Sequence, residues 1–211
     1  MIGNDVGVGQ SPGGRPALAT IDAVTVDAYG TLVTLNDPVG RLAHLLPGHS
    51  AEQVERAFAA EAEHYLARSH EGRDPESLAC LQAECVAVFN EVAGASLRVG
   101  EYLGALVLEP LPGAIAAMDR LAGFGLGTAV VANWDCTLPE RLPGAWTVVT
   151  SAEAGAPKPD PAPFRLALAR LGVEPDRALH VGDSPADEEG ARAAGMSFAP
   201  APLARVVEEW A

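Results

Sequence analysis

Two hydrophobic patterns alternate along most of the chain. Short and nearly continuous apolar runs bounded by turn residues predict strands, and these fall at 23–26, 127–133, 146–152, 178–183 and 196–201. Apolar residues at helical spacing predict helices at 113–121, 161–171 and 187–194. Strands that alternate with helices imply right-handed crossovers. The pattern therefore predicts an α/β fold with a Rossmann-like parallel sheet.

The segment that follows the first strand has a different pattern. Its apolar residues recur near the helical period, with Pro75 suited to a first helical turn and Gly94 to a helix end. We expect residues 37–108 to form an all-helical cap inserted into a core domain made of residues 21–36 and 109–211. Residues 1–20 are rich in Gly and Pro and have no signal-peptide pattern. They are predicted to be a flexible N-terminal tail.

The composition and net charge limit which kinds of binding partner the protein is expected to have. The chain has 211 residues, of which 48% are hydrophobic and 20% charged, as in a globular protein. A net charge of -14 without a run of Lys or Arg argues against a nucleic-acid partner. No apolar stretch reaches membrane-spanning length, and the three cysteines lack disulfide or zinc spacing. We expect a cytoplasmic protein whose partner is a small anionic molecule, with no membrane association. The oligomeric state is not predicted.

Polar side chains gather where the predicted strands end. They are Asp27, Asn133 with Asp135, Lys158, and Asp183 with Asp187. Each alone is usually a turn or surface residue, but ligands of open α/β sheets bind beyond the carboxyl ends of the strands. Their joint occurrence in this order predicts one site. The five histidines show no ligand spacing and are interpreted as surface or core residues.

The residue types at this edge suit the transfer of an anionic group. Asp27 is an oxygen nucleophile that is already ionised at neutral pH. Asp183 and Asp187 lie one helical turn apart, and with Asp27 they make an oxygen-rich cluster suited to Mg²⁺. Lys158 adds positive charge. The backbone N–H groups of the Gly30–Thr31 turn are expected to hold anionic oxygens.

As a set, these motifs resemble the haloacid dehalogenase-like (HAD) superfamily. The resemblance rests on "DAYGT" from Asp27, "VVANWD" around Ala132, "KPDP" from Lys158 and "GDSPAD" from Gly182. It extends from about residue 21 to residue 196. It implies a hydrolase with an inserted helical cap, in which Asp27 forms a covalent intermediate that water then hydrolyses.

The same resemblance implies roles for individual residues. The expected catalytic residues are Asp27, Tyr29, Asn133 and Lys158. The expected substrate-binding residues are Gly30, Thr31, Ala132, Asn133 and Lys158. The implied cofactor is Mg²⁺, and its expected ligands are Asp27, Tyr29 through its backbone carbonyl, Asp183 and Asp187.

Two positions depart from the pattern of the family's phosphatases. Tyr29 stands where those enzymes carry a second aspartate, their general acid and base. Ala132 stands where they carry a Ser or Thr hydroxyl, and Asn133 is expected to substitute for it in part. Loss of a general acid costs about 10²- to 10⁴-fold in rate. The sequence therefore predicts a slow or specialised enzyme.

Several functions stay open at this point. The leading prediction is a Mg²⁺-dependent phosphatase for a small phosphorylated metabolite. The second is a 2-haloacid dehalogenase, because "DAYGTL" resembles the dehalogenases, which use no metal. A catalytically weak binding or scaffold module is the third, given Tyr29 and Ala132. A receiver-type signalling domain is disfavoured by the helical insertion and the acidic pair. The sequence does not name the substrate.

Overall fold

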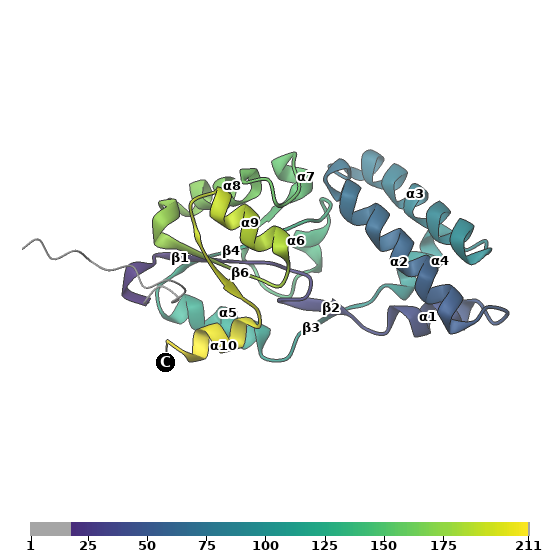
Figure 1. Cartoon of the computed structure of the whole chain (residues 1–211), viewed down its shortest axis with the longest axis horizontal. Helices are drawn as coiled ribbons and strands as arrows, with labels where there is room; N and C mark the ends of the chain where they lie inside the picture. Colours follow the sequence, from purple (N-terminus) through teal and green to yellow (C-terminus); the bar gives the residue numbers. More distant parts are fainter. Residues whose placement is uncertain (1–17, 211) are drawn as a thin grey trace, which may run out of the picture.

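A sheet of five parallel strands forms the centre of the computed structural model, which describes residues 18–210 (Figure 1). In sheet order the strands are β5 (Thr147–Thr150), β4 (Gly127–Ala132), β1 (Ala23–Val26), β6 (Ala178–Gly182) and β7 (Ser197–Pro200). Every neighbouring pair is parallel. The predicted Rossmann-like sheet is confirmed, and β1 lies at its middle.

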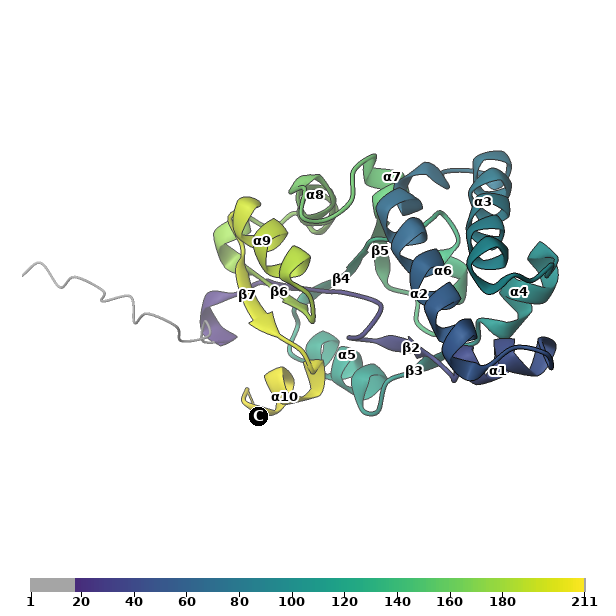
Figure 2. The same ribbon diagram turned by 45° about the vertical axis from the view of Figure 1, so that its right-hand side comes forward.

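Helices cover both faces of this sheet (Figures 1 and 2). Val24 and Val26 of β1 pack in an apolar cluster with α5 (Ala114–Gly123) and α10 (Leu203–Glu208). Ala23 packs in a second cluster with α8 (Ala162–Leu171) and α9 (Pro185–Ala193). Successive side chains of a strand point to opposite faces, so a strand covered on both sides is buried throughout. This explains why all four residues of β1 are buried, with Thr25 as its one polar side chain.

Some short elements were not predicted. They are α6 (Leu138–Arg141), α7 (Ser151–Ala154), α10, β2 (Val33–Leu35), β3 (Leu108–Pro110), η2 (Ser69–Glu71) and η3 (Pro175–Arg177). The strand predicted at 146–152 ends earlier, because the Thr150 hydroxyl accepts a hydrogen bond from the Glu153 N–H at 3.2 Å and starts α7. Of the predicted tail, residues 1–17 lie outside the described residues, and Leu18–Thr20 form the 3-10 helix η1.

Four helices lie between β2 and β3, and we call Pro38–Ala105 the helical insertion. They are α1 (Pro38–Leu45), α2 (Ala51–Arg68), α3 (Pro75–Ala93) and α4 (Val99–Ala105). Val54, Phe89 and Tyr102 are fully buried in a cluster of its own. The antiparallel pairing of β2 with β3 makes the chain enter and leave the insertion at one place (Figure 2). No helix in residues 18–210 combines the length and apolarity needed to span a membrane.

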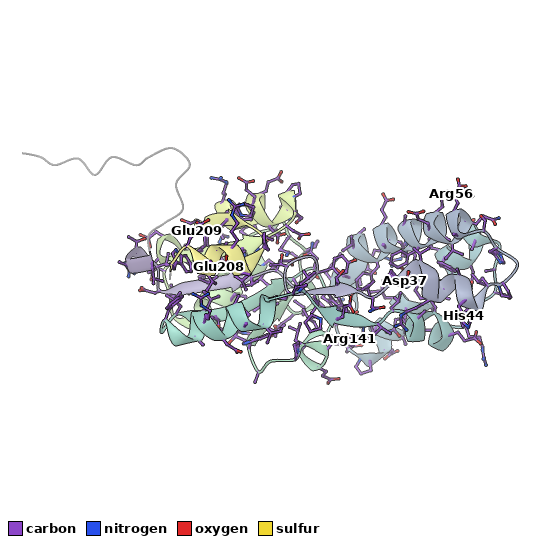
Figure 3. The ribbon with its side chains drawn as sticks, turned by 90° about the horizontal axis from the view of Figure 1, so that it is seen from below. Asp37, His44, Arg56, Arg141, Glu208 and Glu209 are labelled. Atoms are coloured by element: carbon purple, nitrogen blue, oxygen red, sulfur yellow. The ribbon has the colours of Figure 1, made fainter. Side chains whose placement is uncertain are left out.

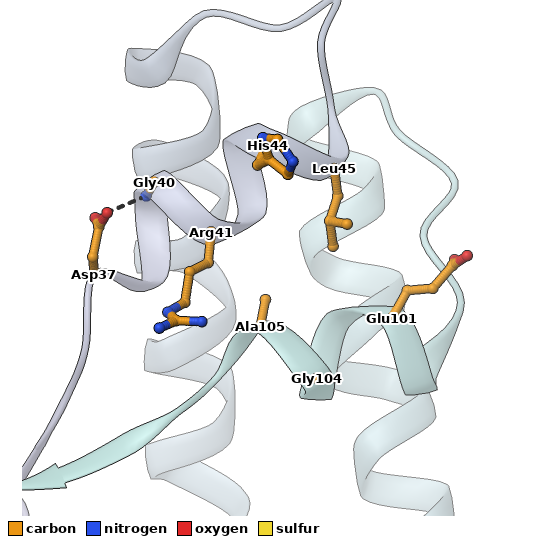
Figure 4. Close-up of a pocket in the computed structure, with 8 residues that line it drawn as sticks. All are labelled: Asp37, Gly40, Arg41, His44, Leu45, Glu101, Gly104 and Ala105. Atoms are coloured by element: carbon orange, nitrogen blue, oxygen red, sulfur yellow. Dashed lines mark hydrogen bonds between the residues drawn. The ribbon is translucent and has the colours of Figure 1, made fainter.

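Capping residues set the ends of the insertion's helices. Helix α3 begins at Pro75 and ends before Gly94, whose φ is 70°, as the sequence predicted. At α1, the Asp37 carboxylate accepts a hydrogen bond from the Gly40 N–H at 3.0 Å (Figure 4). A Cβ on Gly40 would lie 2.1 Å from an Asp37 carboxylate oxygen, so a larger residue there would displace the capping carboxylate.

Polar contacts tie the helical insertion to the core. The Tyr65 hydroxyl of α2 donates to Oδ2 of Asp135 at 2.8 Å, in the loop after β4. The hydroxyls of Ser69 and Ser151 lie 3.1 Å apart. Because Tyr65 and Ser69 are one turn apart at the end of α2, these contacts hold that end of the insertion above the carboxyl edge of the sheet.

The buried acid Glu61 makes folding stability depend on pH. It accepts a hydrogen bond from the Tyr102 hydroxyl at 2.6 Å, and burial raises its pKa above the ordinary value of 4.5. The folded protein therefore holds this proton to a higher pH than the unfolded chain. Stability from this group is lost as pH rises from 4.5 through the folded-state pKa.

We predict that Glu61→Gln, which does not titrate, becomes progressively more stable relative to the wild type as pH rises above 4.5. The other titratable groups contribute equally to the free energy of unfolding of both proteins, so their contributions cancel in the difference between variant and wild type. Urea unfolding of both proteins from pH 4 to pH 8 measures it. A stability difference that stays constant, or moves toward the wild type, would contradict the buried-acid argument.

Candidate active site

The predicted polar residues meet at the carboxyl edge of the sheet. Asp27 directly follows β1, Asn133 follows β4 and Asp183 follows β6. Lys158 comes from the loop between α7 and α8, and its side chain reaches the same place. Asp27 and Lys158 are each only 6% exposed.

The Lys158 ammonium group lies at the centre of the site. Its Nζ donates to Oδ1 of Asp27 at 2.5 Å, to Oδ1 of Asp187 at 2.5 Å and to the carbonyl of Val131 at 3.0 Å. An ammonium group has three donors, and all three are used. Oδ2 of Asp27 accepts no hydrogen bond from the described part of the chain, so this oxygen is left without a donor.

Asn133 fixes the loop that carries Lys158. Its Oδ1 accepts from the Lys158 N–H at 2.6 Å, and its Nδ2 donates to the Lys158 carbonyl at 3.0 Å. The side-chain amide is thus paired with a backbone peptide on both sides. Asn133 acts here as a positioning residue for the lysine. Its expected contact with substrate in place of a missing hydroxyl stays a prediction.

Asp187 is committed to the protein itself. Its Oδ2 accepts from the Ser184 hydroxyl at 2.6 Å and from the Ser184 N–H at 3.1 Å, which forms the capping box of α9. Its Oδ1 accepts from Lys158 and from Nε2 of His180 at 3.0 Å. Asp183, by contrast, is exposed. Asp187 therefore holds Lys158, His180 and Ser184 in place through its hydrogen bonds. The exposed carboxylate of Asp183 is accessible to a ligand.

His180 and Thr25 belong to the same network, and sequence reasoning missed both. Nε2 of His180 must carry the proton because the Asp187 carboxylate only accepts, so Nδ1 accepts from the Thr25 hydroxyl at 2.8 Å. Burial lowers the pKa of His180, which keeps the ring neutral. A signal existed in the polar residue within the buried strand "ALHVG", directly before the acidic motif.

Burial and neighbouring charges shift the pKa values of the acids. Burial raises the pKa of Asp27 to about 6, although Lys158 opposes the shift, and the nearby charge of Asp187 adds to it. Hydrogen bonds from His180 and Lys158 hold the pKa of Asp187 well below its usual range despite its burial. The site thus gathers three acids around one lysine, an excess of negative charge.

Of the two backbone N–H groups in the Gly30–Thr31 turn that were expected to bind an anion, the one of Gly30 is already used. The N–H of Gly30 donates to the Val33 carbonyl at 2.9 Å and so closes the turn, which leaves the N–H of Thr31 for the predicted anion contact. A Cβ on Gly30, whose φ is 81°, would lie 2.1 Å from Oδ2 of Asp183. The Thr31 hydroxyl is buried without a hydrogen-bond partner in residues 18–210. Buried hydroxyl groups are normally hydrogen-bonded, so this one is available to a ligand.

The acids are arranged as a cation site would require. Asp27, Asp183 and Asp187 each offer a carboxylate oxygen, and these oxygens all lie within 4.8 Å of one another. Carboxylate oxygens are hard ligands that suit Mg²⁺. The missing Cβ at Gly30 is what lets Asp183 approach this cluster.

Two of the predicted site residues, Ala132 and Tyr29, lie in apolar surroundings. Ala132 is 2% exposed and its methyl group packs in the core cluster, so it offers no hydrogen bond to a substrate. Tyr29 is 46% exposed and lines a cavity of about 190 Å³ between the helical insertion and the core. Arg141, labelled in Figure 3, lines the same cavity.

A larger hollow of about 470 Å³ lies elsewhere, between α1 and α4 of the helical insertion (Figure 4). Asp37, Arg41, His44 and Glu101 line it, and the residues around Lys158 do not. The chemistry-bearing residues therefore gather at the sheet edge, beside the smaller cavity.

The family model of the haloacid dehalogenase-like hydrolases matches residues 21–195. The chain therefore belongs to the haloacid dehalogenase-like hydrolases, as the motifs indicated. Over 93 residues it is 44% identical to the haloacid dehalogenase-like hydrolase domain-containing protein 3 of Mus musculus, covering 41% of this chain and 37% of that protein. Over 112 residues it is 39% identical to a phosphoglycolate phosphatase of Rhodospirillum rubrum, covering 47% of this chain and 46% of the other.

These matches reach less than half the length of either curated relative. Among solved structures, the L-2-haloacid dehalogenase from Xanthobacter autotrophicus superposes with a TM-score of 0.66 at 24% identity, covering 85% of this chain and 77% of that one. Identity at this level shows a shared fold. The family model confirms the predicted hydrolase class, and the structural similarity confirms the predicted Rossmann-like fold.

We predict that Asn133→Ala lowers hydrolytic turnover at least about tenfold, because a misplacement of about 1 Å costs up to about a hundredfold. Loss of the paired hydrogen bonds should also cost about 1–3 kcal/mol of stability. The measurements are turnover of a chromogenic aryl phosphate and urea unfolding.

Asn90 provides a matched control in the helical insertion. Its side chain pairs with the N–H and carbonyl of Leu97, both at 2.9 Å, in the same two-sided geometry. Asn90→Ala should lose similar stability and keep its turnover. Equal losses of turnover in the two variants would show that Asn133 matters only for folding.

Proposed function

We propose that this protein is a Mg²⁺-dependent phosphatase that hydrolyses a small phosphorylated metabolite through an aspartyl-phosphate intermediate. The observation that carries the proposal is the buried Lys158 bridge, which occupies Oδ1 of Asp27 and leaves Oδ2 without a donor. Support comes from the phosphoglycolate phosphatase among the curated relatives. Three free cysteines fit a reducing, cytoplasmic location.

Asp27 supplies the nucleophile in the proposed reaction. Its Oδ2 forms a bond to phosphorus while the bond from phosphorus to the ester oxygen breaks, and that oxygen leaves with its electron pair. Lys158 holds the carboxylate in place and offsets charge at the reacting centre. Water then attacks phosphorus and gives up a proton to the solvent while the bond from phosphorus to Oδ2 breaks, which releases inorganic phosphate and regenerates the Asp27 carboxylate. The departed oxygen takes up a proton from the solvent.

The charge balance of the site supports a bound cation. Asp27, Asp183 and Asp187 outnumber Lys158, so an anionic phosphate meets net repulsion unless positive charge is added. Asp27 and Asp183 are the carboxylates suited to hold Mg²⁺ directly, with the backbone carbonyl of Tyr29 as the further proposed ligand. Mg²⁺ in this position would neutralise phosphate oxygens.

Tyr29 limits the substrates that such an enzyme turns over well. The transition state of phosphoryl transfer is loose in most analyses, so negative charge builds on the departing oxygen. A tyrosine, whose ordinary pKa is near 10, is a weak proton donor. We therefore propose that the enzyme favours esters whose alcohol or phenol leaves readily.

A second candidate function is 2-haloacid dehalogenation. The specific observation in its favour is Tyr29 after Asp27, within "DAYGTL". In that reaction Oδ2 of Asp27 would displace halide from carbon, and no metal would be needed. Chelation separates the two candidates, because it should abolish phosphatase turnover and leave dehalogenation intact.

We predict that Asp183→Asn weakens Mg²⁺ binding more than Asp187→Asn does. Asp183 is exposed and free to coordinate, whereas both oxygens of Asp187 already accept hydrogen bonds from the protein. Asp187→Asn should instead reduce thermal stability more, because it takes the anion away from Lys158. Calorimetric titration with Mg²⁺ and thermal unfolding measure the two effects.

Chelated wild type is the control for that titration, and phosphate release from aryl and acyl phosphates is followed in parallel. Turnover of phosphate esters that persists in excess chelator would refute the metal dependence. Mg²⁺ affinities that fall equally in the two variants would refute the division of roles between Asp183 and Asp187.

A further inference from the structure

The cavity of about 190 Å³ has an apolar wall built from both parts of the protein. Its apolar lining comes from Leu35, Phe58, Leu66, Leu103, Leu106 and Trp134. They belong to the helical insertion, to β2, to the segment between α4 and β3, or to the loop after β4. Binding of a hydrocarbon group against such a wall removes apolar surface from water on both sides. The hydrophobic effect therefore stabilises the bound group.

Most polar residues of the lining are already paired within the protein. Glu61 accepts from the Tyr102 hydroxyl at 2.6 Å, and Tyr65 donates to Asp135 at 2.8 Å. Asn133 is paired with the backbone of Lys158. Arg141 also lines the cavity, where it is exposed and forms no ion pair within residues 18–210. Apart from contact with Arg141 at the solvent-exposed side, a charged group that entered the interior would lose hydration without gaining a free partner of opposite charge.

The size of the cavity sets the size of its ligand. An apolar protein cavity of ~150 Å³ is large enough to bind benzene. The present cavity of about 190 Å³ therefore has room for one six-membered ring or a short branched chain.

The position of the cavity connects it to the nucleophile. Tyr29 lines the cavity two residues after Asp27. Asn133, which also lines it, holds the loop whose lysine contacts Asp27 at 2.5 Å. A group bonded to a phosphate at Asp27 thus has this cavity next to it.

We propose that the cavity binds the leaving group, and that the substrates are phosphate monoesters of an uncharged, apolar alcohol or phenol of about one ring. This rests on the proposed phosphatase function and adds the chemical class of its substrate. It separates this chain from its phosphoglycolate phosphatase relative, whose named substrate has a carboxylate on the leaving group. A phenol is also a good leaving group, which suits a site with Tyr29 in place of an acid.

The test uses one substitution at two positions of α2. Ala62 lines the cavity, and Ala62→Phe fills it. Ala59 is exposed on the same helix and does not line the cavity, so Ala59→Phe controls for the added ring and for helix propensity. The probes are benzylphosphonate, methylphosphonate and phosphonoacetate, which are not hydrolysed. Their binding is measured by calorimetry in the presence of Mg²⁺.

Wild type and Ala59→Phe should bind benzylphosphonate about ten- to a hundredfold more tightly than methylphosphonate, as expected for burial of one ring. In Ala62→Phe the two affinities should become equal. Equal affinities in the wild type, failure of both phosphonates to bind, or like behaviour of the two Phe variants would overturn the proposal. Tighter binding of phosphonoacetate than of benzylphosphonate would overturn the uncharged class.

Turnover is measured separately, so the two proposals can fail separately. If the ring preference holds but no phosphate ester is hydrolysed, the cavity assignment stands and the phosphatase function falls. If esters are hydrolysed with no ring preference, the phosphatase function stands and the substrate class falls. Phenyl phosphate and acetyl phosphate are the matched substrates, and Ala62→Phe should slow phenyl phosphate selectively.

Discussion

The site depends on one buried ion bridge, in which Lys158 lies between Asp27 and Asp187. A lone buried ammonium group or carboxylate costs several kcal/mol, so each of these groups is tolerable only because the others are present. The bridge uses all three donors of Lys158 and fixes one oxygen of Asp27. The orientation of the Asp27 carboxylate therefore follows from its ion pair with a lysine that the fold has buried.

The surrounding fold supplies what this bridge requires. Parallel strands bring Asp27 and the Val131 carbonyl to one edge of the sheet, and Asn133 holds the loop that carries Lys158. The capping box of α9 and the neutral ring of His180 hold Asp187 in its ionised form. Beyond this edge, the helical insertion contributes Phe58, Leu66 and Leu103 to the apolar wall of the cavity. In the proposed function, the core provides the chemistry and the insertion contributes to the selection of substrate.

The sequence predicted the parallel sheet because strands buried on both faces are apolar runs that end in polar residues. It also predicted Asp27, Lys158 and Asp183, because their spacing along the chain carries the family's pattern. It missed Thr25 and His180, whose hydrogen bond joins residues 155 positions apart on neighbouring strands. It also misjudged Gly30, since only the structure shows that its N–H closes the turn and that its missing Cβ makes room for Asp183. A polar residue within a buried strand marks His180 as unusual, but its partners on neighbouring elements cannot be identified from one sequence.

The central claim is that Oδ2 of Asp27 takes the transferred group covalently. The most direct test is rapid acid quenching during turnover of an aryl phosphate in Mg²⁺, followed by peptide mapping by mass spectrometry. The account predicts a phosphoryl group on the peptide that contains Asp27, present only while substrate remains and absent in Asp27→Asn. Turnover that proceeds with no phosphorylated peptide, or with the phosphoryl group on another residue, would contradict it.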